Sequence, residues 1–194
     1  MLRRLFSIIN ILDSKDCTVE DVNNLWQTYF QNADKVYLKK KEAIILEGEV
    51  TESVYYVKNG CLRSWFNKDG NDVSFQFFLE GSFLLSFDSF MYDEPSLFTV
   101  EAILPTTLYV IPKKQFKEKI AESSELKNAV FRVVCERMRH YQRLFLSRIK
   151  DTPQERYEEL VKNNSDLLRK IPQHYIASYL GITSVSLSRI RCRK

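Results

Sequence analysis

The stretch QHYIASYLGITSVSLSRIRC, residues 173–192, has the pattern of two short helices that cross at a tight turn. Ala177 supplies the small residue that a close helix crossing needs. Gly181 can adopt the left-handed conformation that ends the first helix, and Thr183 is placed to cap the second. The inward positions of the pair are all apolar: Ile176, Leu180, Ile182, Leu187 and Ile190. The pattern predicts a helix-turn-helix, although an ordinary helical hairpin would also have apolar residues at these positions.

The second helix of a helix-turn-helix presents its N-terminal residues to base edges in the major groove of DNA. Arg189 is our candidate for paired hydrogen bonds to guanine O6 and N7. We also expect Tyr175, near the start of the first helix, to contact the DNA backbone. The remaining candidate DNA-binding residues are Gln173, Thr183, Ser184, Val185, Ser186, Ser188 and Arg191.

The charge distribution is consistent with this prediction. The chain has a formal charge of +4, and six of its 29 basic residues, but none of its 25 acidic ones, lie after position 168. A basic end on a slightly acidic body is typical of a nucleic-acid-binding module. A solvated basic tail would have the same composition, so the charge supports the motif without replacing it.

Residues 35–112 have the sequence pattern of an all-β sandwich or barrel. Short runs of β-branched and aromatic residues are separated by turn signals every 8 to 12 residues or so. The clearest pair joins 61–66 to 73–78 across Asp69-Gly70, because Gly supplies the positive φ of a tight turn. Before this region, Thr18 and Asp21 begin a predicted amphipathic helix over residues 18–32.

A helical period returns after Pro112, with a short helix over 113–121 and a long one from 123 or 124 to 150. The apolar stripe of the long helix could pack on the chain's own β domain, form a coiled-coil-like dimer seam, or do both. We favour a homodimer through residues 123–150. Thr152, Pro153 and Glu155 then form a capping box that begins the next helix. The stripe consists of Leu126, Val130, Val133, Val134, Met138, Tyr141, Leu144, Phe145 and Ile149.

A β-roll, a long helix and a C-terminal helix-turn-helix, in that order, resemble the Crp/Fnr (catabolite activator) family of transcription regulators. The local anchors of the resemblance are residues 45–49, 54–60, 80–83 and 176–189. It implies an α+β fold with an N-terminal double-stranded β-helix of the cyclic-nucleotide-binding type over 1–122. It also implies a dimerisation helix over 123–150 and a winged helix-turn-helix-like DNA-binding domain over 151–194. The implied partners are operator DNA, a second copy of the chain and RNA polymerase.

The chain departs from this family at its phosphate-binding cassette. Cyclic-nucleotide binders have Glu after the glycine for the ribose hydroxyl, and a later Arg that pairs with the cyclic phosphate. Here Gly81 is followed by Ser82, and Ser96 stands where the Arg is expected. We therefore expect no cyclic AMP, and either an apolar side-chain filling or a different, unknown effector. The candidate effector pocket consists of Phe75, Gly81, Ser82, Phe83, Ser96 and Leu97.

Other classes of function have little basis in the sequence. The four cysteines form no CxxC pair and the two histidines have no metal-ligand spacing, so we expect neither a cofactor nor a metal. No catalytic constellation or Gly-rich phosphate loop indicates an enzyme. No apolar run is long enough to span a bilayer, and we expect a cytoplasmic protein. The alternative function is a ligand-binding or protein-interaction module with a vestigial DNA-binding domain.

Overall fold

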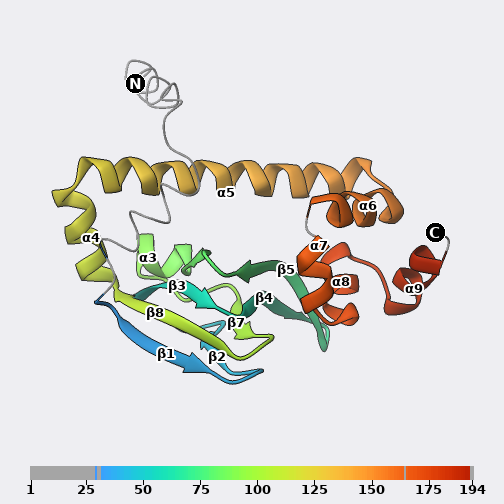
Figure 1. The fold of residues 1–194 in the computed structure, drawn as a ribbon, viewed down its shortest axis with the longest axis horizontal. Coiled ribbons are helices and arrows are strands. Elements are labelled where there is room, and N and C mark those ends of the chain that lie inside the picture. Colours follow the sequence, from blue (N-terminus) through green and yellow to red (C-terminus); the bar gives the residue numbers. More distant parts are fainter. Residues whose placement is uncertain (1–28, 30–31, 164, 193–194) are drawn as a thin grey trace, which may run out of the picture.

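A computed structural model describes residues 29, 32–163 and 165–192. The predicted helix over 18–32 lies almost wholly outside these residues. Figure 1 shows a β-roll beneath the long helix α5, with α4 at one end of the roll and α6 to α9 at the other. None of the described helices combines the length and the apolar character needed to cross a membrane.

The β-roll consists of two antiparallel four-stranded sheets. The first has the order β1 (Asp34–Leu38), β8 (Thr106–Pro112), β3 (Ser53–Asn59) and β6 (Phe83–Leu84). The second has the order β2 (Ala43–Ile45), β7 (Thr99–Ala102), β4 (Cys61–Lys68) and β5 (Asn71–Leu79). Strands far apart in the chain pair with one another, as they do in a double-stranded β-helix, so the predicted fold class is confirmed.

The predicted hairpin is confirmed as β4 and β5. Its register runs from Cys61 opposite Leu79 to Lys68 opposite Asn71, with a shift between Ser64 and Trp65. Gly70 has a φ of +83°, which is the left-handed value that the turn requires. The interior of the roll is apolar, and Val57, Leu62, Val100, Ala102 and Leu108 are all fully buried there.

Helices α3 (Phe87–Tyr92) and α4 (Lys113–Glu122) flank the roll. The side chain of Ser123 caps α5 (Ser124–Lys150) by accepting a hydrogen bond from the N–H of Leu126 (3.1 Å). Leu126 and Ala129 are buried in a cluster with Phe116 of α4, so the first turns of α5 are anchored on the chain's own domain.

Four helices complete the chain: α6 (Pro153–Asn163), α7 (Ser165–Lys170), α8 (Gln173–Leu180) and α9 (Ser184–Cys192). The capping box at the start of α6 is present, because Glu155 accepts hydrogen bonds from the backbone N–H (2.7 Å) and hydroxyl (2.8 Å) of Thr152. Within 151–192, omitting Asn164, the structure contains helices and turns and no β-hairpin wing.

Candidate nucleic-acid interface

The turn between α8 and α9 has the geometry that the sequence predicts. Gly181 ends α8 in the left-handed conformation (φ 70°, ψ 34°), and the N–H of Ile182 donates to the carbonyl oxygen of Ala177 (3.0 Å). Thr183 caps α9, since its hydroxyl oxygen accepts from the N–H of Ser186 (3.1 Å). Leu187 is buried on the inner side of α9, so the opposite side faces outward.

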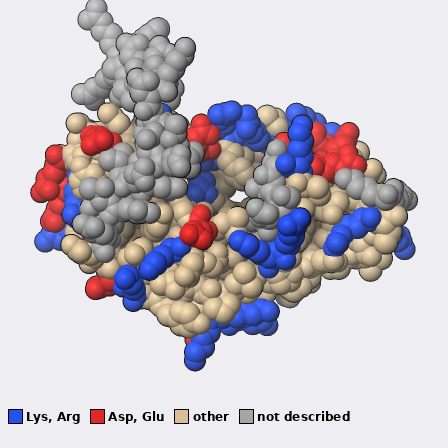
Figure 2. Space-filling model, in the orientation of Figure 1, with Lys and Arg blue, Asp and Glu red and all other residues tan. Residues whose placement is uncertain are grey.

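With the exception of Tyr175, the predicted DNA-contacting side chains are accessible to solvent on α9, at its cap or at the start of α8. Val185 is 61% exposed, Ser186 is half-buried, and the other predicted side chains are exposed: Gln173, Thr183, Ser184, Ser188, Arg189 and Arg191. Arg189 and Arg191 form no ion pair with any other described residue. Figure 2 shows that acidic side chains gather at the end of the molecule where α6 lies. The first turn of α9 therefore presents hydroxyls and Val185, and Arg189 follows in the last turn.

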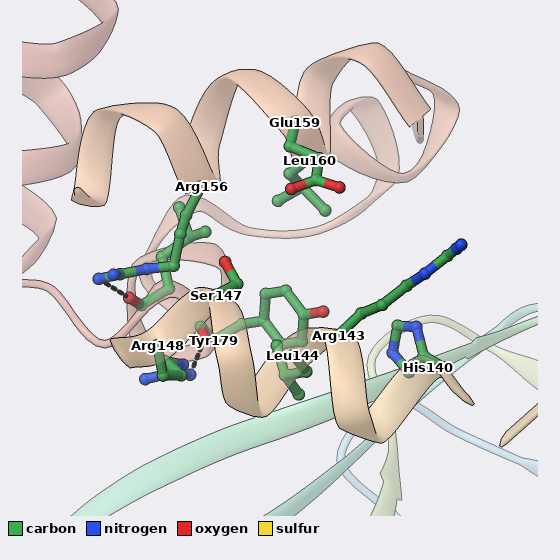
Figure 3. Close-up of a pocket in the computed structure, with 10 residues that line it drawn as sticks. His140, Arg143, Leu144, Ser147, Arg148, Arg156, Glu159, Leu160 and Tyr179 are labelled. Atoms are coloured by element: carbon green, nitrogen blue, oxygen red, sulfur yellow. Dashed lines mark hydrogen bonds between the residues drawn. The ribbon is translucent and has the colours of Figure 1, made fainter. Parts of the chain in front are cut away.

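Two arginines hold the last turn of α8 against α5 and α6 (Figure 3). Arg156 of α6 donates from Nη2 to the carbonyl oxygen of Leu180 (3.1 Å) and from Nη1 to that of Asp151 (2.6 Å). Arg148 of α5 donates from Nη2 to the carbonyl oxygen of Tyr179. Because the last carbonyls of a helix lack intrahelical partners, both guanidiniums act as C-terminal caps that fix the turn of the helix-turn-helix.

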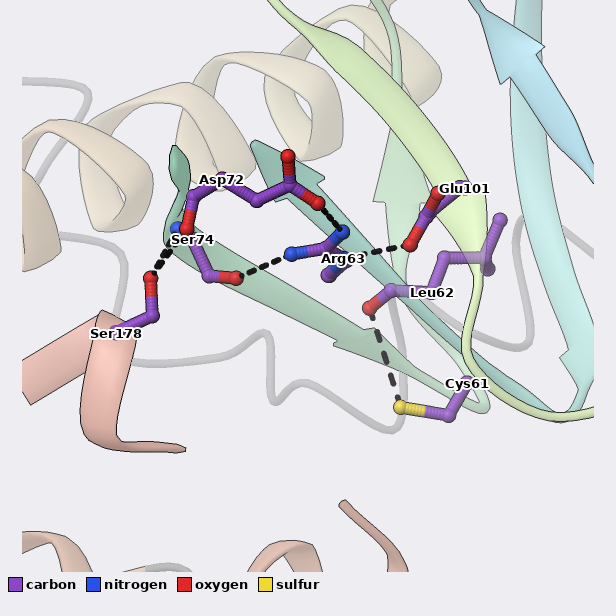
Figure 4. A network of polar contacts seen from close by, with 7 residues as sticks. All are labelled: Cys61, Leu62, Arg63, Asp72, Ser74, Glu101 and Ser178. Carbon is purple, nitrogen blue, oxygen red and sulfur yellow. Dashed lines mark hydrogen bonds and ion pairs between the residues drawn. The ribbon is translucent and has the colours of Figure 1, made fainter. Parts of the chain in front are cut away.

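The other side of α8 is attached to the β4–β5 hairpin, as Figure 4 shows. Ser178 of α8 accepts a hydrogen bond from the N–H of Ser74 (2.9 Å), and its hydroxyl donates to the carbonyl oxygen of Asp72 (2.9 Å). Cys61 and Ile103 of the roll share one buried cluster with side chains from α6, α7, α8 and α9. The helix-turn-helix and the roll are therefore packed together through a common core.

Arg63 is the polar centre of this attachment. Its guanidinium is only 1% exposed and donates to Glu101 (2.7 Å), Asp72 (2.8 Å) and Ser74 (3.0 Å). The guanidinium carbon lies 3.9 Å from the ring centroid of Tyr175 on α8. A buried arginine is tolerated here because each of its nitrogens has an acceptor and its flat face contacts an aromatic ring.

Tyr175 corrects one of our sequence expectations. We expected its side chain to contact the DNA backbone, but the ring is buried against the roll, and burial raises the pKa of its hydroxyl. The sequence reasoning also missed the role of Arg63. The only available signal was a cation within the apolar strand pattern, and that signal does not identify partners 38 or more residues away, as Glu101 and Tyr175 are.

The predicted effector-pocket residues are divided among three environments. Phe75 packs edge-on against Phe98 (centroids 5.3 Å apart), whereas Phe83 packs on Tyr56 (4.7 Å) beneath α5. Leu97 is 69% exposed. These three side chains therefore have different surroundings.

The polar groups of the same region are bonded within the protein. The hydroxyl of Ser96, which is 2% exposed, donates to the carbonyl oxygen of Phe98 (2.8 Å). The hydroxyl of Ser82 accepts from the N–H of Leu79 (3.2 Å), and the N–H of Gly81 donates to the carbonyl oxygen of Val57 (3.0 Å). At position 96, where the family has its arginine, the serine hydroxyl is already bonded to the backbone of Phe98. Arg137 of α5 reaches the same region, where its Nη2 donates to the carbonyl oxygen of Phe83 (3.3 Å).

The structure joins a β-roll to a helix-turn-helix formed by α8 and α9. Known proteins share parts or most of this arrangement. Residues 35–123 match the cyclic nucleotide-binding domain family. Transcriptional activator protein Anr of Pseudomonas protegens is 26% identical over 167 residues, which cover 80% of this chain and 68% of that protein. Anr of Pseudomonas aeruginosa is 25% identical over 187 residues, covering 91% and 75%.

Solved structures share the fold over most of the chain. FixK2 of Bradyrhizobium japonicum superposes with a TM-score of 0.71 at 21% identity, covering 83% of each chain. A CooA mutant of Carboxydothermus hydrogenoformans has a TM-score of 0.71 at 16% identity, covering 92% of this chain and 84% of that one. The chain therefore has the fold of these proteins, contains a region of the cyclic nucleotide-binding domain family, and is similar to named transcriptional activators over most of its length.

Proposed function

We propose that the chain binds operator DNA sequence-specifically through α8 and α9. The observation that carries this proposal is the exposed surface of α9: its capped first turn presents hydroxyls and Val185 to solvent, and its last turn presents Arg189. Arg189 is assigned to a guanine, and Arg191 and Gln173 to phosphates, which position the protein without specifying sequence. Residues 151–194 form the DNA-binding domain, and residues 1–122 form the sensor domain.

The DNA-bound form in this proposal is a homodimer joined along α5, residues 123–150. The start of α5 is packed on the roll, but farther along the helix a row of apolar side chains is exposed. Met138 is 60% exposed, and the others in the row are Val134, Tyr141, Phe145, Leu146 and Ile149. Their recurrence at intervals of three and four residues is typical of a helix–helix seam. The long helix thus has both of the roles that its stripe allows.

Cyclic AMP is not the proposed effector, because neither Ser82 nor Ser96 can replace the cassette's carboxylate and guanidinium. The relatives are named transcriptional activators, so we include RNA polymerase among the partners and place the protein in the cytoplasm, where both it and DNA are found. In this proposal the chain is not an enzyme and the domain over 151–194 is not vestigial.

The test begins with selection of a binding sequence from random duplex DNA by the full-length protein. Arg189→Ala should weaken binding to the selected site by about 1–3 kcal/mol and relax the preference at one base pair. Arg139→Ala, on the exposed part of α5, is the matched control and should leave binding unchanged. The slope of log K against log salt should be about −0.9 per phosphate contact.

The vestigial alternative predicts a different result. Under it, no sequence is enriched in the selection and duplex binding shows no such salt dependence. Unchanged sequence preference in Arg189→Ala would reject our placement of the recognition helix, even if DNA binding itself were confirmed.

A further inference from the structure

A cavity of about 350 Å³ lies where α5, α6 and α8 meet, directly behind the turn of the helix-turn-helix. Figure 3 shows side chains from all three helices around it. Its apolar wall includes Leu144 and Leu160, and its polar wall includes Arg143, Ser147, Arg148 and Arg156. The volume is within the range of small-molecule sites, and an apolar wall with a few converging polar groups is typical of them.

The charge of this cavity is not balanced by the protein. Three arginines are among its lining residues, with Arg148 and Arg156 at one end and Arg143 at the other (Figure 3), whereas Glu159 is the only carboxylate among them. Within the described part of the chain, none of the three arginines is in an ion pair. Nε of Arg156 is buried and has no hydrogen-bond partner there. Burial and the positive charge of Arg156 both lower the pKa of Arg148, so a neighbouring cation raises the cost of keeping Arg148 charged.

The proposed dimer seam leaves this cavity open. The seam residues Val134, Met138, Tyr141 and Phe145 lie along one line of α5, at intervals of four, three and four residues. Of the cavity residues on this helix, Arg143 and Ser147 lie on the side opposite the row, whereas Leu144 and Arg148 lie at its edge. A second copy packed on the apolar row therefore leaves the Arg143 and Ser147 side of the cavity uncovered.

We propose that this cavity is the effector site, and that it takes a small organic anion carrying a phosphate group. The proposal rests on the proposed function, since it assigns an effector to the DNA-binding regulator. A phosphate would supply the missing negative charge and acceptors for guanidinium N–H groups, which bind phosphate oxygens in paired geometry. Leu144, Leu160 and Tyr179 would contact the organic part.

The position of the cavity couples the anion to DNA reading. Arg148 and Arg156 line the cavity and also donate to the carbonyl oxygens of Tyr179 and Leu180, the last two residues of α8. Occupancy redistributes these donors between the anion and α8, and this changes how firmly the helix-turn-helix is held against α5 and α6. By linkage, the anion and the operator alter each other's affinity by the same factor.

The first experiment measures binding of inorganic phosphate, pyrophosphate and AMP to the full-length protein by calorimetry, without DNA and at matched ionic strength. Adenosine is the uncharged control. Saturable binding of a phosphate-containing probe, but not of adenosine, is expected. Arg143→Gln should weaken it about tenfold, the effect of losing one charge-assisted contact. Ser147→Glu, which brings a carboxylate into the cavity, should abolish it. Arg139→Gln, an equal charge change elsewhere on α5, should leave it unchanged.

The second experiment compares operator affinity with and without a saturating probe. A change of threefold or more in the wild type, absent in Ser147→Glu, supports the effector role. Any one of three results would overturn the effector proposal: no saturable binding of a phosphate-containing probe below about 10 mM, equal binding by Ser147→Glu and the wild type, or an operator affinity that the probe leaves unchanged. Failure of the proposed function is distinguishable, because the protein would then enrich no DNA sequence whether or not the anion binds.

Discussion

Substitution of Arg63 by Met tests the attachment between the roll and the DNA-binding head. The change removes two ionic hydrogen bonds, to Glu101 and Asp72, one bond to Ser74, and the contact with the ring of Tyr175. The Asp72 side chain is 44% exposed, so solvent screens its share, whereas that of Glu101 is only 11% exposed. Met keeps much of the buried stem, and the dominant cost is therefore Glu101 left without its cation. Removing one partner of such a buried pair costs about 3–5 kcal/mol.

The assay is urea unfolding of the full-length protein followed by far-ultraviolet circular dichroism, with a double-mutant cycle through Glu101→Leu. Because the double variant leaves no buried charge behind, Arg63→Met/Glu101→Leu should be more stable than Arg63→Met alone. Ser178→Ala reports the neighbouring neutral contacts and should cost about 1 kcal/mol. A cost below about 1 kcal/mol for Arg63→Met, or costs that simply add in the double variant, would refute the role assigned to this ion pair.

Three further predictions concern the proposed dimer seam of α5, the thiol of Cys61 and the ion pair between Lys113 and Asp93. Met138→Glu places a charge in the exposed apolar row of α5 and should convert the dimer to a monomer, as measured by the molar mass in light scattering. Arg139→Glu, at the next position, should leave the dimer intact. An equal molar mass for Met138→Glu and the wild type would argue against this seam. Burial raises the pKa of Cys61 to about 12. In a variant with the other three cysteines replaced by serine, Cys61 should therefore resist reagents that react with thiolates at pH 8, until α6 to α9 detach from the roll. Arg63→Met should make this labelling faster. Rapid labelling of the native protein would contradict the shared core. The hydrogen bond and charge of Lys113 lower the pKa of Asp93, so this pair stabilises the fold above pH 3.8 and its contribution is lost as pH falls below that value. Between pH 7 and pH 3, the urea midpoint of Asp93→Asn should therefore fall less than that of the wild type. An equal fall in the two proteins would count against the pair.

Elements defined by neighbouring residues were predicted well from the sequence. The β4–β5 hairpin depends on Gly70, the start of α6 on Thr152 and Glu155, and the turn of the helix-turn-helix on Gly181 and Thr183. In each case, the hydrogen bonds or backbone angles that matter involve residues within five positions of one another. Such interactions form whenever the local chain adopts the element, so a sequence pattern is sufficient to reveal them.

The candidate site was predicted only in part. The exposed residues of α9 could be identified, because burial of Ile176, Leu180 and Leu187 determines which side of the helix pair faces outward. Tyr175 could not be placed, since either environment suits an amphipathic side chain at the edge of an apolar stripe. The effector pocket proposed within the roll remains a prediction, and its six residues have different surroundings in the structure.

The sequence by itself determined the order of parts, the helix-turn-helix and the absence of the cyclic-nucleotide anchors at Ser82 and Ser96. Only the tertiary structure decided that the helix-turn-helix packs on the roll through Arg63 and Tyr175, and that arginines of α5 and α6 line a cavity behind its turn. The reason is physical: Arg63 and Tyr175 are far apart in the chain, and Arg156 and Arg148 bond to carbonyl groups 24 and 31 positions away. These contacts form only when the path of α5 and α6 places α8 against the β4–β5 hairpin, and a periodic pattern in the sequence does not specify that path.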